Sequence, residues 1–471
     1  MSNPPSRLCA FPYPSEYDQP RPTVTVQKGM YFDPHDADEL NEIEEILDEY
    51  DLNQQMEDIS NPESVEERMP VDVQGHAVHR ERYRALCRRY IDRFSHKVRL
   101  EPARVTPMRI ELDDDAWLAA NNQGKIRIQG TEKEAVIAEF IEKLSSGGVI
   151  SRSQSKRYSH PTLTRKSNGS WRLCIDFRRL NKHSKKSSYP LPHINTMLAR
   201  IGSRKPRVFA VFDLTQGFYQ APLHPDSRAC TAFMTFMGLF EWNRVPMGIK
   251  GAPTYFQEVM ESEVLSGLLH SICELYMDDL ILYANSEDQL LEHMELLFQR
   301  LREYNITLNP AKAHIGLEEI EYVGHLLSAT GISFTSDKIS KVVELPRPTV
   351  KHELKRFLGL VNYFRDHLMN LAFYTQPLQS LLTNYKKDDP TPIQWTEETL
   401  EAYNAVMGLL RTLPKLWYLD DNKEFPIHLY TDASNLGFGA YLCQKVPSEN
   451  SPRPIAFLSR SCQGSERTGA L

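Results

Sequence analysis

Apolar residues recur every three or four positions in two stretches of the chain, the spacing typical of amphipathic helices. The first covers residues 132–146, where Thr131 and Glu134 predict a capping box and Gly147 follows the last apolar turn. Its expected buried face consists of Val136, Ile137, Phe140, Ile141 and Leu144. The second begins at Ser286, with Gln289 completing another capping box. Its expected buried stripe consists of Leu290, Met294, Leu297 and Leu301.

Other segments have the short apolar runs that are typical of strands. These expected strands and hairpins are residues 160–165, 171–177, 208–214, 275–284 and 427–444. Asn168-Gly169 separates the first two, which predicts a hairpin. Residues 335–385 predict helices that are interrupted at Pro346 and Pro348.

The composition is that of a globular protein with several domains. The 471 residues are 41% hydrophobic and 25% charged, which at about 100–200 residues per domain predicts two to four domains. A membrane span would need about 18 consecutive apolar residues, and we find no such run. The first 14 residues contain four prolines and no apolar core, so a secretory signal is not expected. We therefore expect an intracellular location, the cytoplasm by default and the nucleus as an alternative.

The spacing of the cysteines and the distribution of charge limit the classes of protein to which the chain could belong. Seven cysteines without a Cys-x-x-Cys pair argue against a zinc module or a disulfide scaffold. Residues 1–75 hold 18 of the 62 acidic residues and 4 of the 55 basic residues, so the rest of the chain is net basic. A basic body is compatible with a polyanionic partner. The acidic, proline-rich extension is expected to be disordered, as a solvated linker or an upstream remnant.

Three aspartates stand in apolar surroundings where a strand would not ordinarily place them. Asp213 ends an apolar strand, and Asp278 and Asp279 lie in the middle of an apolar hairpin. Adjacent carboxylates repel each other and lose hydration there, so a divalent cation is the natural compensation. Oxygen ligands favour Mg²⁺, with Mn²⁺ as a substitute, and two such ions suit nucleotidyl transfer. The alternative is an ordinary acidic turn or solvated strand edge.

Tyr276-Met277-Asp278-Asp279 resembles the catalytic box of reverse transcriptases. The surrounding sequence is similar to the Pol polyproteins of Gypsy-type long-terminal-repeat retrotransposons, over about residues 100–470. The ordered blocks that carry this resemblance are residues 171–178, 180–182, 189–192, 212–218, 245–248, 252–257, 308–312, 322–325 and 357–365.

The resemblance implies catalytic and nucleotide-binding roles. Asp213 and Asp278 match the two metal-binding aspartates of the family, and Asp279 matches the supporting third acid, so all three are expected catalytic and metal-site residues. Arg172 matches the arginine that contacts the incoming triphosphate, which suits a bidentate guanidinium. Arg165 or Lys166 would supply a second positive charge. Without the resemblance, an exposed basic hairpin would explain these three basic residues.

Three further positions are assigned by motif. Phe218 matches the aromatic steric gate that excludes a ribose 2′-hydroxyl, with ordinary core packing as the alternative. Met247 occupies a nucleotide-contacting loop where relatives often carry Gln or Phe. Gly324 and His325 match the primer-grip turn that contacts primer and template, with a simple tight turn as the alternative.

The C-terminal segment resembles the first part of an RNase H domain. The matching residues are 429–434 and 437–440, and Asp432 matches the first metal-binding acid of that domain. One aspartate cannot assemble a two-metal site, and Glu466 comes too early to match the next acid. We therefore expect a truncated domain without RNase H activity. Boxes typical of an aspartic protease, a zinc knuckle or an integrase are not found, so the sequence resembles a polyprotein fragment or a decayed copy.

The resemblance implies an α+β fold of the right-hand polymerase type, with fingers, palm and thumb. The expected regions are a disordered extension (1–75), fingers and palm (76–330), thumb and connection helices (331–424) and an incomplete RNase H-like α/β segment (425–471). The expected function is RNA-directed DNA synthesis from dNTPs on a primed RNA or DNA template. A catalytically inactive nucleic-acid-binding remnant is the alternative, and an RNA-synthesising polymerase is disfavoured by Phe218.

Overall fold

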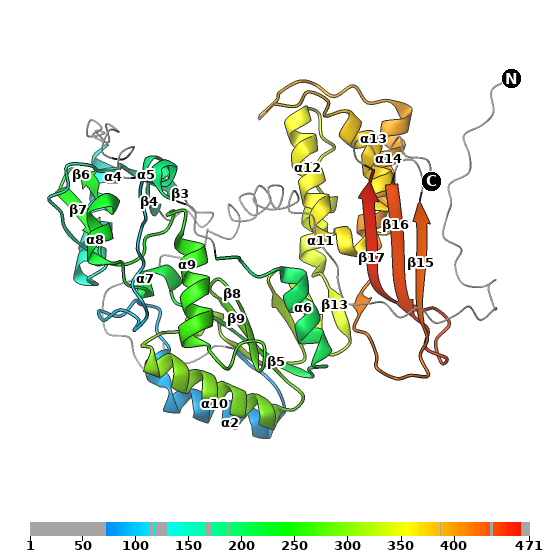
Figure 1. Ribbon diagram of the computed structural model, residues 1–471, viewed down its shortest axis with the longest axis horizontal. Helices are drawn as coiled ribbons and strands as arrows, with labels where there is room; N and C mark the ends of the chain where they lie inside the picture. The colour runs from blue at the N-terminus through cyan, green and yellow to red at the C-terminus, as the bar shows by residue number, and fades with distance from the viewer. Residues whose placement is uncertain are drawn as a thin grey trace. The chain divides into compact units, whose positions relative to one another are not determined.

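The computed structural model describes residues 72–113, 117, 130–165, 171–185, 189–386, 388–433 and 437–462. The expected Asn168-Gly169 turn and most of the extension 1–75 lie outside these residues. The chain divides into two compact units, one of residues 49–330 and a second that contains residues 331–471 (Figure 1). Each unit has its own hydrophobic core.

A five-stranded sheet organises the unit of residues 49–330. Its strand order is β1 (Asp72–Val73), β10 (His314–Leu317), β5 (Val208–Asp213), β9 (Asp279–Ala284) and β8 (Cys273–Tyr276). The central strand β5 is antiparallel to both neighbours, and every residue of it except Val211 is buried. The expected strand at 208–214 and the hairpin at 275–284 are therefore confirmed.

Helices cover this sheet. Helix α10 (Glu287–Glu303) packs against β5 and β9, and α2 (Ala77–Arg89) packs along α10 (Figure 1). The Ser286 side chain caps α10 by accepting a hydrogen bond from the Gln289 backbone N–H, at 3.2 Å. The expected stripe of α10 is fully buried, as predicted. Helices α6 (Ile194–Ser203) and α9 (Ala252–Val259) belong to the same unit.

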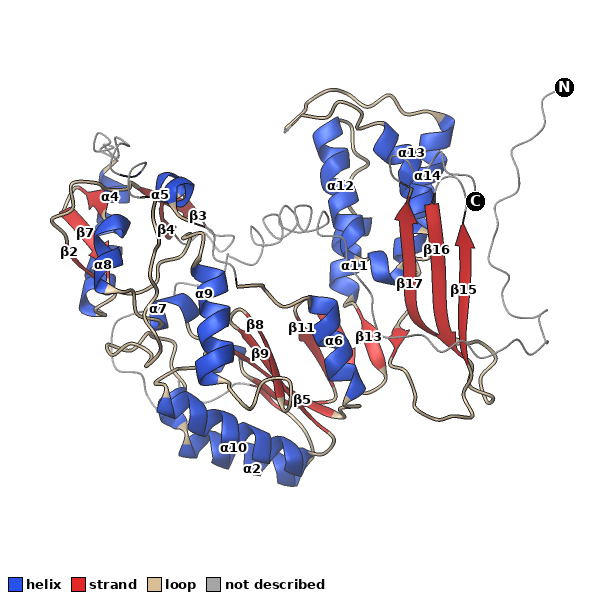
Figure 2. Cartoon of the chain, viewed as in Figure 1, coloured by secondary structure: helices blue, strands red, loops and turns tan. Residues whose placement is uncertain are grey.

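A smaller region of the same unit contains a three-stranded sheet and a separate hairpin (Figure 2). The sheet has the order β2 (Ile150–Arg152), β7 (Gly238–Trp242) and β6 (Phe233–Thr235), and the hairpin joins β3 (Pro161–Arg165) to β4 (Trp171–Ile175). The helices here are α4 (Thr131–Ser146), α5 (Arg178–His183) and α8 (Pro225–Arg228), whereas the short helix α7 (Gly217–Gln220) lies near the β8–β9 turn of the central sheet. Short helical turns are η2 (Ile91–Arg93), η3 (Ala229–Thr231), η4 (Met260–Val264) and η5 (Pro310–Lys312).

Two local predictions in this region are wrong. Thr131 is the first residue of α4, not its cap, and Gly130 at the cap position provides no side-chain hydrogen bond. The strand expected over 171–177 ends at Ile175, because the Asp176 carboxylate accepts the Arg178 backbone N–H at 3.2 Å and begins α5. The buried face of α4 otherwise follows the prediction at Ile137, Ile141 and Leu144.

A hairpin of β11 (Glu319–Tyr322) and β12 (His325–Ser328) follows β10. Its two turn residues, Val323 and Gly324, have φ angles of 44° and 77°. Positive φ at both positions is the requirement of the type I′ turn, whose twist matches antiparallel strands. Gly324 meets it without strain, whereas Val323 does so at a steric cost.

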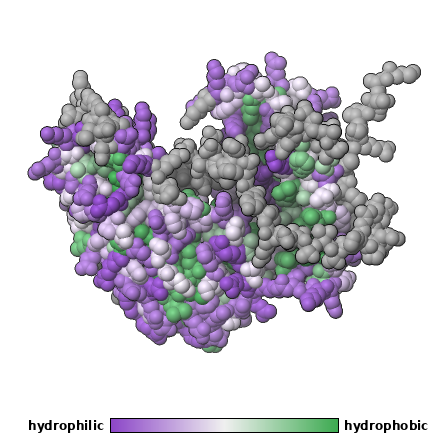
Figure 3. All heavy atoms as spheres, viewed as in Figure 1, coloured by the Kyte–Doolittle hydropathy of each residue, from purple (hydrophilic) through white to green (hydrophobic). Residues whose placement is uncertain are grey.

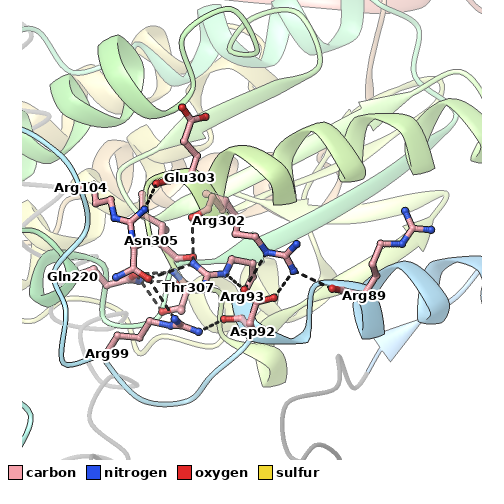
Figure 4. A network of polar contacts seen from close by, with 12 residues as sticks. Arg89, Asp92, Arg93, Arg99, Arg104, Gln220, Arg302, Glu303, Asn305 and Thr307 are labelled. Carbon is pink, nitrogen blue, oxygen red and sulfur yellow. Dashed lines mark hydrogen bonds and ion pairs between the residues drawn. The ribbon is translucent and has the colours of Figure 1, made fainter.

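A network of arginines ties the N-terminal segment to the end of α10 (Figure 4). Arg93 is 3% exposed and donates hydrogen bonds to Asn305 and to the carbonyls of Leu301 and Ile306. Asp92 forms ion pairs with Arg93 and Arg302. The buried Arg93 guanidinium thus exchanges hydration for several fixed acceptors.

The unit that contains residues 331–471 combines helices with a three-stranded sheet. The helices are α11 (Ser336–Val343), α12 (Lys351–Tyr363), η6 (Arg365–His367), α13 (Leu371–Ser380) and α14 (Glu397–Arg411). The strands are β13 (Gly331–Ser333) and β14 (Leu416–Trp417), which pair, and the consecutive sheet β15 (Ile427–Ala433), β16 (Gly437–Gln444) and β17 (Arg453–Ser461). The expected interruption at Pro346 and Pro348 separates α11 from α12.

The visible surface of the described segments is mainly hydrophilic, as Figure 3 shows. None of the helices in the described ranges combines the length and hydrophobicity that crossing a bilayer requires.

Gly331 and Gly408 allow a matched test of packing in the second unit. A Cβ at Gly331 would lie 2.1 Å from the Leu416 carbonyl oxygen, whereas a Cβ at Gly408, inside α14, would meet nothing within 4 Å. We expect Gly331→Ala to lower the free energy of unfolding by more than about 1 kcal/mol, because the β13–β14 pair must separate. Gly408→Ala should raise it by about 0.5–1 kcal/mol. Urea unfolding followed by circular dichroism measures both, and equal effects would contradict the β13–β14 pairing.

Candidate active site

The central strand β5 delivers Asp213 to the candidate site. Its preceding residues are anchored by the buried side chains of Phe209 and Phe212, and Asp213 itself is 6% exposed. Asp213 pairs directly with Asp279 in the β5–β9 register. The Leu214 backbone N–H donates to the Asp278 carbonyl at 3.1 Å, which joins the end of β5 to the β8–β9 turn.

Asp278 lies in the tight turn between β8 and β9. The preceding residue, Met277, has a φ of 55°, a left-handed conformation that is costly for a residue with a side chain. Gly217 packs against the turn, where a Cβ would stand 3.3 Å from the Asp278 Cβ and from the Phe256 ring. Glycine therefore permits the close approach of α7 to the Asp278 turn.

Burial and charge act together on Asp213. Burial, reinforced by the Asp278 carboxylate, raises the pKa of Asp213 to about 6, although Lys312 opposes the shift. Lys312 Nζ lies 3.0 Å from Asp213 Oδ2. Asp213 Oδ1 is buried and has no hydrogen-bond partner. A buried carboxylate oxygen that lacks a partner is costly unless a ligand or an ion satisfies it.

Asp279 interacts with Tyr322 of the β11–β12 hairpin. Burial raises the pKa of the Tyr322 phenol, and the Asp279 carboxylate adds to this shift. The Tyr322 hydroxyl donates to the Asp279 carbonyl at 3.3 Å. Asp279 is thus linked to the β11–β12 hairpin.

Gln257 holds the strained turn and was not singled out by the sequence. It is fully buried on α9; its Oε1 accepts the Met277 N–H at 2.8 Å, and its Nε2 donates to the Leu275 carbonyl at 3.1 Å. The same Nε2 donates to Glu261 at 2.7 Å, and Glu261 also accepts a hydrogen bond from the Tyr189 hydroxyl. One buried amide therefore binds the backbone at two positions on the β8 side of the Asp278 turn.

Phe218 lies in α7, and the cap residue before this helix, Gln216, has a left-handed conformation with a φ of 46°. Its ring contacts the Phe256 ring edge-on, with centroids 5.4 Å apart, and it is partly buried against the core. Gln220 fixes the other end of α7 by bonding the Thr215 and Thr307 carbonyls at 2.8 and 2.9 Å. The aromatic ring is thereby placed in a rigid helix close to the Asp278 turn.

Arg172 lies on the β3–β4 hairpin. Arg172 is on β4, opposite Thr164, and its Nε is buried without a hydrogen-bond partner. Burial and the Cys174 thiol raise the pKa of Tyr219, the residue after Phe218, and the Arg172 guanidinium opposes that shift. Arg165 instead stacks its guanidinium 4.5 Å above the Trp171 ring. Lys166 lies outside the described residues.

Asn181 positions the loop that carries Met247. Its Nδ2 donates to the Gly248 carbonyl at 2.8 Å, and its Oδ1 accepts the Lys250 N–H at 3.0 Å. Met247 packs partly buried against the core. Gly248 has a φ of 85°, so the loop needs glycine at this point.

The β11–β12 turn contains the expected primer-contacting residues. The His325 imidazole is buried, with 7% of the residue exposed, and its Nδ1 lies 2.9 Å from the Val323 carbonyl oxygen. Gly324, at the tip, is half-buried. The backbone at Gly324 is thus the more accessible part of this turn.

Two segments of the chain match known protein-family profiles. Residues 164–327 match the family profile described as "Reverse transcriptase (RNA-dependent DNA polymerase)". This region is a reverse transcriptase domain. Residues 395–470 match the profile "RNase H-like domain found in reverse transcriptase". The expected family is therefore confirmed.

Relatives of this chain include Pol polyproteins of Drosophila melanogaster. The "Retrovirus-related Pol polyprotein from transposon opus" is 33% identical over 70% of this chain and 33% of its own length. The corresponding protein from transposon 412 is 32% identical over 80% of this chain and 30% of its own length, and that from transposon gypsy is 29% identical over 70% and 32%. The chain thus spans about a third of the length of these relatives.

Solved structures confirm the α+β polymerase fold. The foamy viral protease-reverse transcriptase in complex with dsDNA superposes with a TM-score of 0.71 at 21% identity, covering 88% of this chain and 84% of that chain. A related foamy viral structure, also with double-stranded DNA, gives a TM-score of 0.72 at 20% identity, covering 87% and 71%.

The RNase H-like segment places Asp432 near the end of β15. Its Oδ1 accepts the Ala433 N–H at 2.9 Å, and the residue is exposed. No other acidic side chain occurs on the described residues of β15, β16 and β17. Glu466 lies outside the described residues.

The reverse transcriptase site fits a divalent cation at two carboxylates. The unpartnered Asp213 Oδ1 and the neighbouring Asp278 offer the hard oxygen ligands that Mg²⁺ prefers, and Mg²⁺ commonly takes one or two carboxylates together with substrate phosphates. Within the described parts of the chain, no three His, Cys, Asp or Glu side chains gather as a metal-binding group. The candidate cation site is therefore the pair of Asp213 and Asp278, with Asp279 beside it in the β5–β9 register.

The pKa of Asp213 predicts a pH-dependent stability difference. Because the folded-state pKa of about 6 exceeds the usual 3.8, protonation of Asp213 stabilises the fold; this contribution is complete below pH 3.8 and is lost as the pH rises through 6. In EDTA at pH 7.5, Asp213→Asn should therefore raise the free energy of unfolding by up to about 2–3 kcal/mol. The gain should shrink at pH 5. Urea unfolding measures it, with Asp337→Asn, an exposed carboxylate, as the control; a less stable variant at pH 7.5 would contradict the unfavourable burial of Asp213.

Proposed function

We propose that the reverse transcriptase domain catalyses RNA-directed DNA synthesis, adding dNTPs to a primer on an RNA or DNA template. The observation that carries this proposal is the buried Asp213 carboxylate, with an oxygen that lacks a partner, beside Asp278 at the end of the central sheet. The names of the structural neighbours support the choice of partner, since they describe reverse transcriptases bound to dsDNA and to an RNA/DNA hybrid.

Asp213 and Asp278 would hold Mg²⁺, with Mn²⁺ as a substitute. A bound pair of these ions supplies activation of the primer 3′-hydroxyl and charge neutralisation on the leaving pyrophosphate. The protein contributes position: Gln257 fixes the Asp278 turn, and the β5 register fixes Asp213. Asp279 supports the site through the β11–β12 hairpin.

Nucleotide and primer contacts follow from the same geometry. Arg172 would bind the triphosphate, because its buried Nε needs an acceptor and a guanidinium binds phosphate bidentately. Phe218 would meet the sugar, and Met247 would line the nucleotide pocket on the loop that Asn181 holds. Backbone groups at Gly324 would contact the primer, while His325 stabilises the turn.

We further propose that β15, β16 and β17 do not cleave RNA by themselves. A two-metal nuclease site needs several carboxylates, and the described residues of these strands carry Asp432 alone.

Primer extension on an RNA template with Mg²⁺ and dNTPs tests the polymerase. We expect extension by the wild type and by Asp337→Asn, a solvent-exposed control, and loss of at least about 100-fold in Asp278→Asn. Replacing a residue that only hydrogen-bonds to a metal ligand already lowers metal affinity or activity by about 10–100-fold, so replacing a ligand should cost at least as much. If the wild type fails to extend but binds primer–template in a salt-dependent manner, the inactive nucleic-acid-binding remnant is the correct function.

Sugar selection tests Phe218. In Phe218→Val, we expect the kcat/KM ratio of a ribonucleotide to the matching deoxynucleotide to rise about 10-fold or more, because a smaller side chain admits the 2′-hydroxyl. Phe236→Val is the matched control, since Phe236 is 48% exposed at the β6–β7 turn. An unchanged ratio in Phe218→Val would leave Phe218 with core packing only.

A further inference from the structure

Lys312 is the cation that faces Asp213 in the structure. Its Nζ lies 3.0 Å from Asp213 Oδ2, and its side chain is 30% exposed, whereas the Asp213 side chain is 9% exposed. Asp213 Oδ1 remains without a hydrogen-bond partner. One oxygen of the carboxylate is therefore paired with a protein charge, and the other is buried without a hydrogen-bond partner.

Hydrogen bonds fix the backbone around Lys312 to the end of β5, so the position of Lys312 relative to Asp213 is set by the fold. The Asn309 N–H donates to the Asp213 carbonyl at 2.9 Å, and the Asn309 side chain caps η5 by accepting the Ala311 N–H at 3.1 Å. Thr307, two residues before Asn309, is bonded to the buried Gln220 at 2.8 Å. Lys312 thus starts from a segment that moves with Asp213.

The Lys312–Asp213 ion pair lies beside a second carboxylate, that of Asp278. Asp213 and Asp278 are neighbouring carboxylates, and in a partly buried site their repulsion is only weakly screened. Lys312 supplies the positive charge that balances this repulsion when a divalent cation is absent. A divalent cation that binds Asp213 has to share or displace this charge, because both seek the same carboxylate.

We propose that Lys312 is a resident counter-ion: it occupies Asp213 Oδ2 in the cation-free domain and weakens divalent-cation binding by competing for that carboxylate. Lys312 is in this sense a positioning residue, which keeps Asp213 in place before the cation arrives. The inference rests on the metal role proposed above for Asp213 and Asp278.

The test is Mn²⁺ binding to the full chain without nucleic acid, with free Mn²⁺ measured by electron paramagnetic resonance. We expect Lys312→Met to bind Mn²⁺ about 10-fold more tightly than the wild type, because the competing charge is gone. Lys312→Gln, which keeps a polar donor, should show the same direction and serves if the Met variant does not fold. Lys341→Met, which removes an exposed lysine paired with Asp337 at 2.8 Å, should leave the affinity unchanged.

Two outcomes separate this inference from the proposed function. Wild-type affinity or weaker binding in both Lys312 variants, together with loss of Mn²⁺ binding in Asp213→Asn and Asp278→Asn, would overturn the counter-ion role alone. Retained binding in both aspartate variants would overturn the metal site itself, and the counter-ion role with it.

Discussion

The structure of the reverse transcriptase domain depends on holding two like charges together at one end of its central sheet, the buried Asp213 and the half-buried Asp278. Asp213 and Asp278 come from elements 65 positions apart, and their repulsion would separate them if the backbone were free. Three restraints oppose that separation: the β5–β9 register, the amide of Gln257 on the Asp278 turn, and the ion pair with Lys312. The energy that stabilises the site thus comes from its surroundings.

The elements around the site are predictable because they follow simple periodic patterns. The apolar run of β5, the hairpin around Asp278 and the stripe of α10 all lie where the hydrophobic pattern places them. The caps are less predictable. Ser286 caps its helix as expected, whereas Thr131 does not, because the chain enters α4 one residue earlier at Gly130. A capping motif specifies the chemistry of a helix start, and the path of the preceding chain decides its position.

The candidate site is predictable only in part, because its supporting contacts are tertiary. The aspartates stand out in the sequence as charges among apolar residues, and the motifs supplied Arg172 and Phe218. Gln257 and Lys312 lie in quoted motif blocks, yet nothing local reveals what they touch: Gln257 reaches a turn 20 residues away, and Lys312 reaches a carboxylate 99 residues away. For Gln257, a polar residue on the buried side of α9 is the one available signal. His325 differs again, since its side chain folds back on its own turn.

The arginine network of the N-terminal segment has a consequence for how the domain folds. Arg93 finds its acceptors at Leu301, Asn305 and Ile306, more than 200 positions further along the chain. Contacts of such long sequence separation carry a large loop-closure cost and form late. During synthesis, this guanidinium must stay hydrated until the end of α10 has left the ribosome. The segment around Arg93 therefore reaches its final environment only after residues 301–306 have been synthesised, although it precedes most of the domain in the sequence.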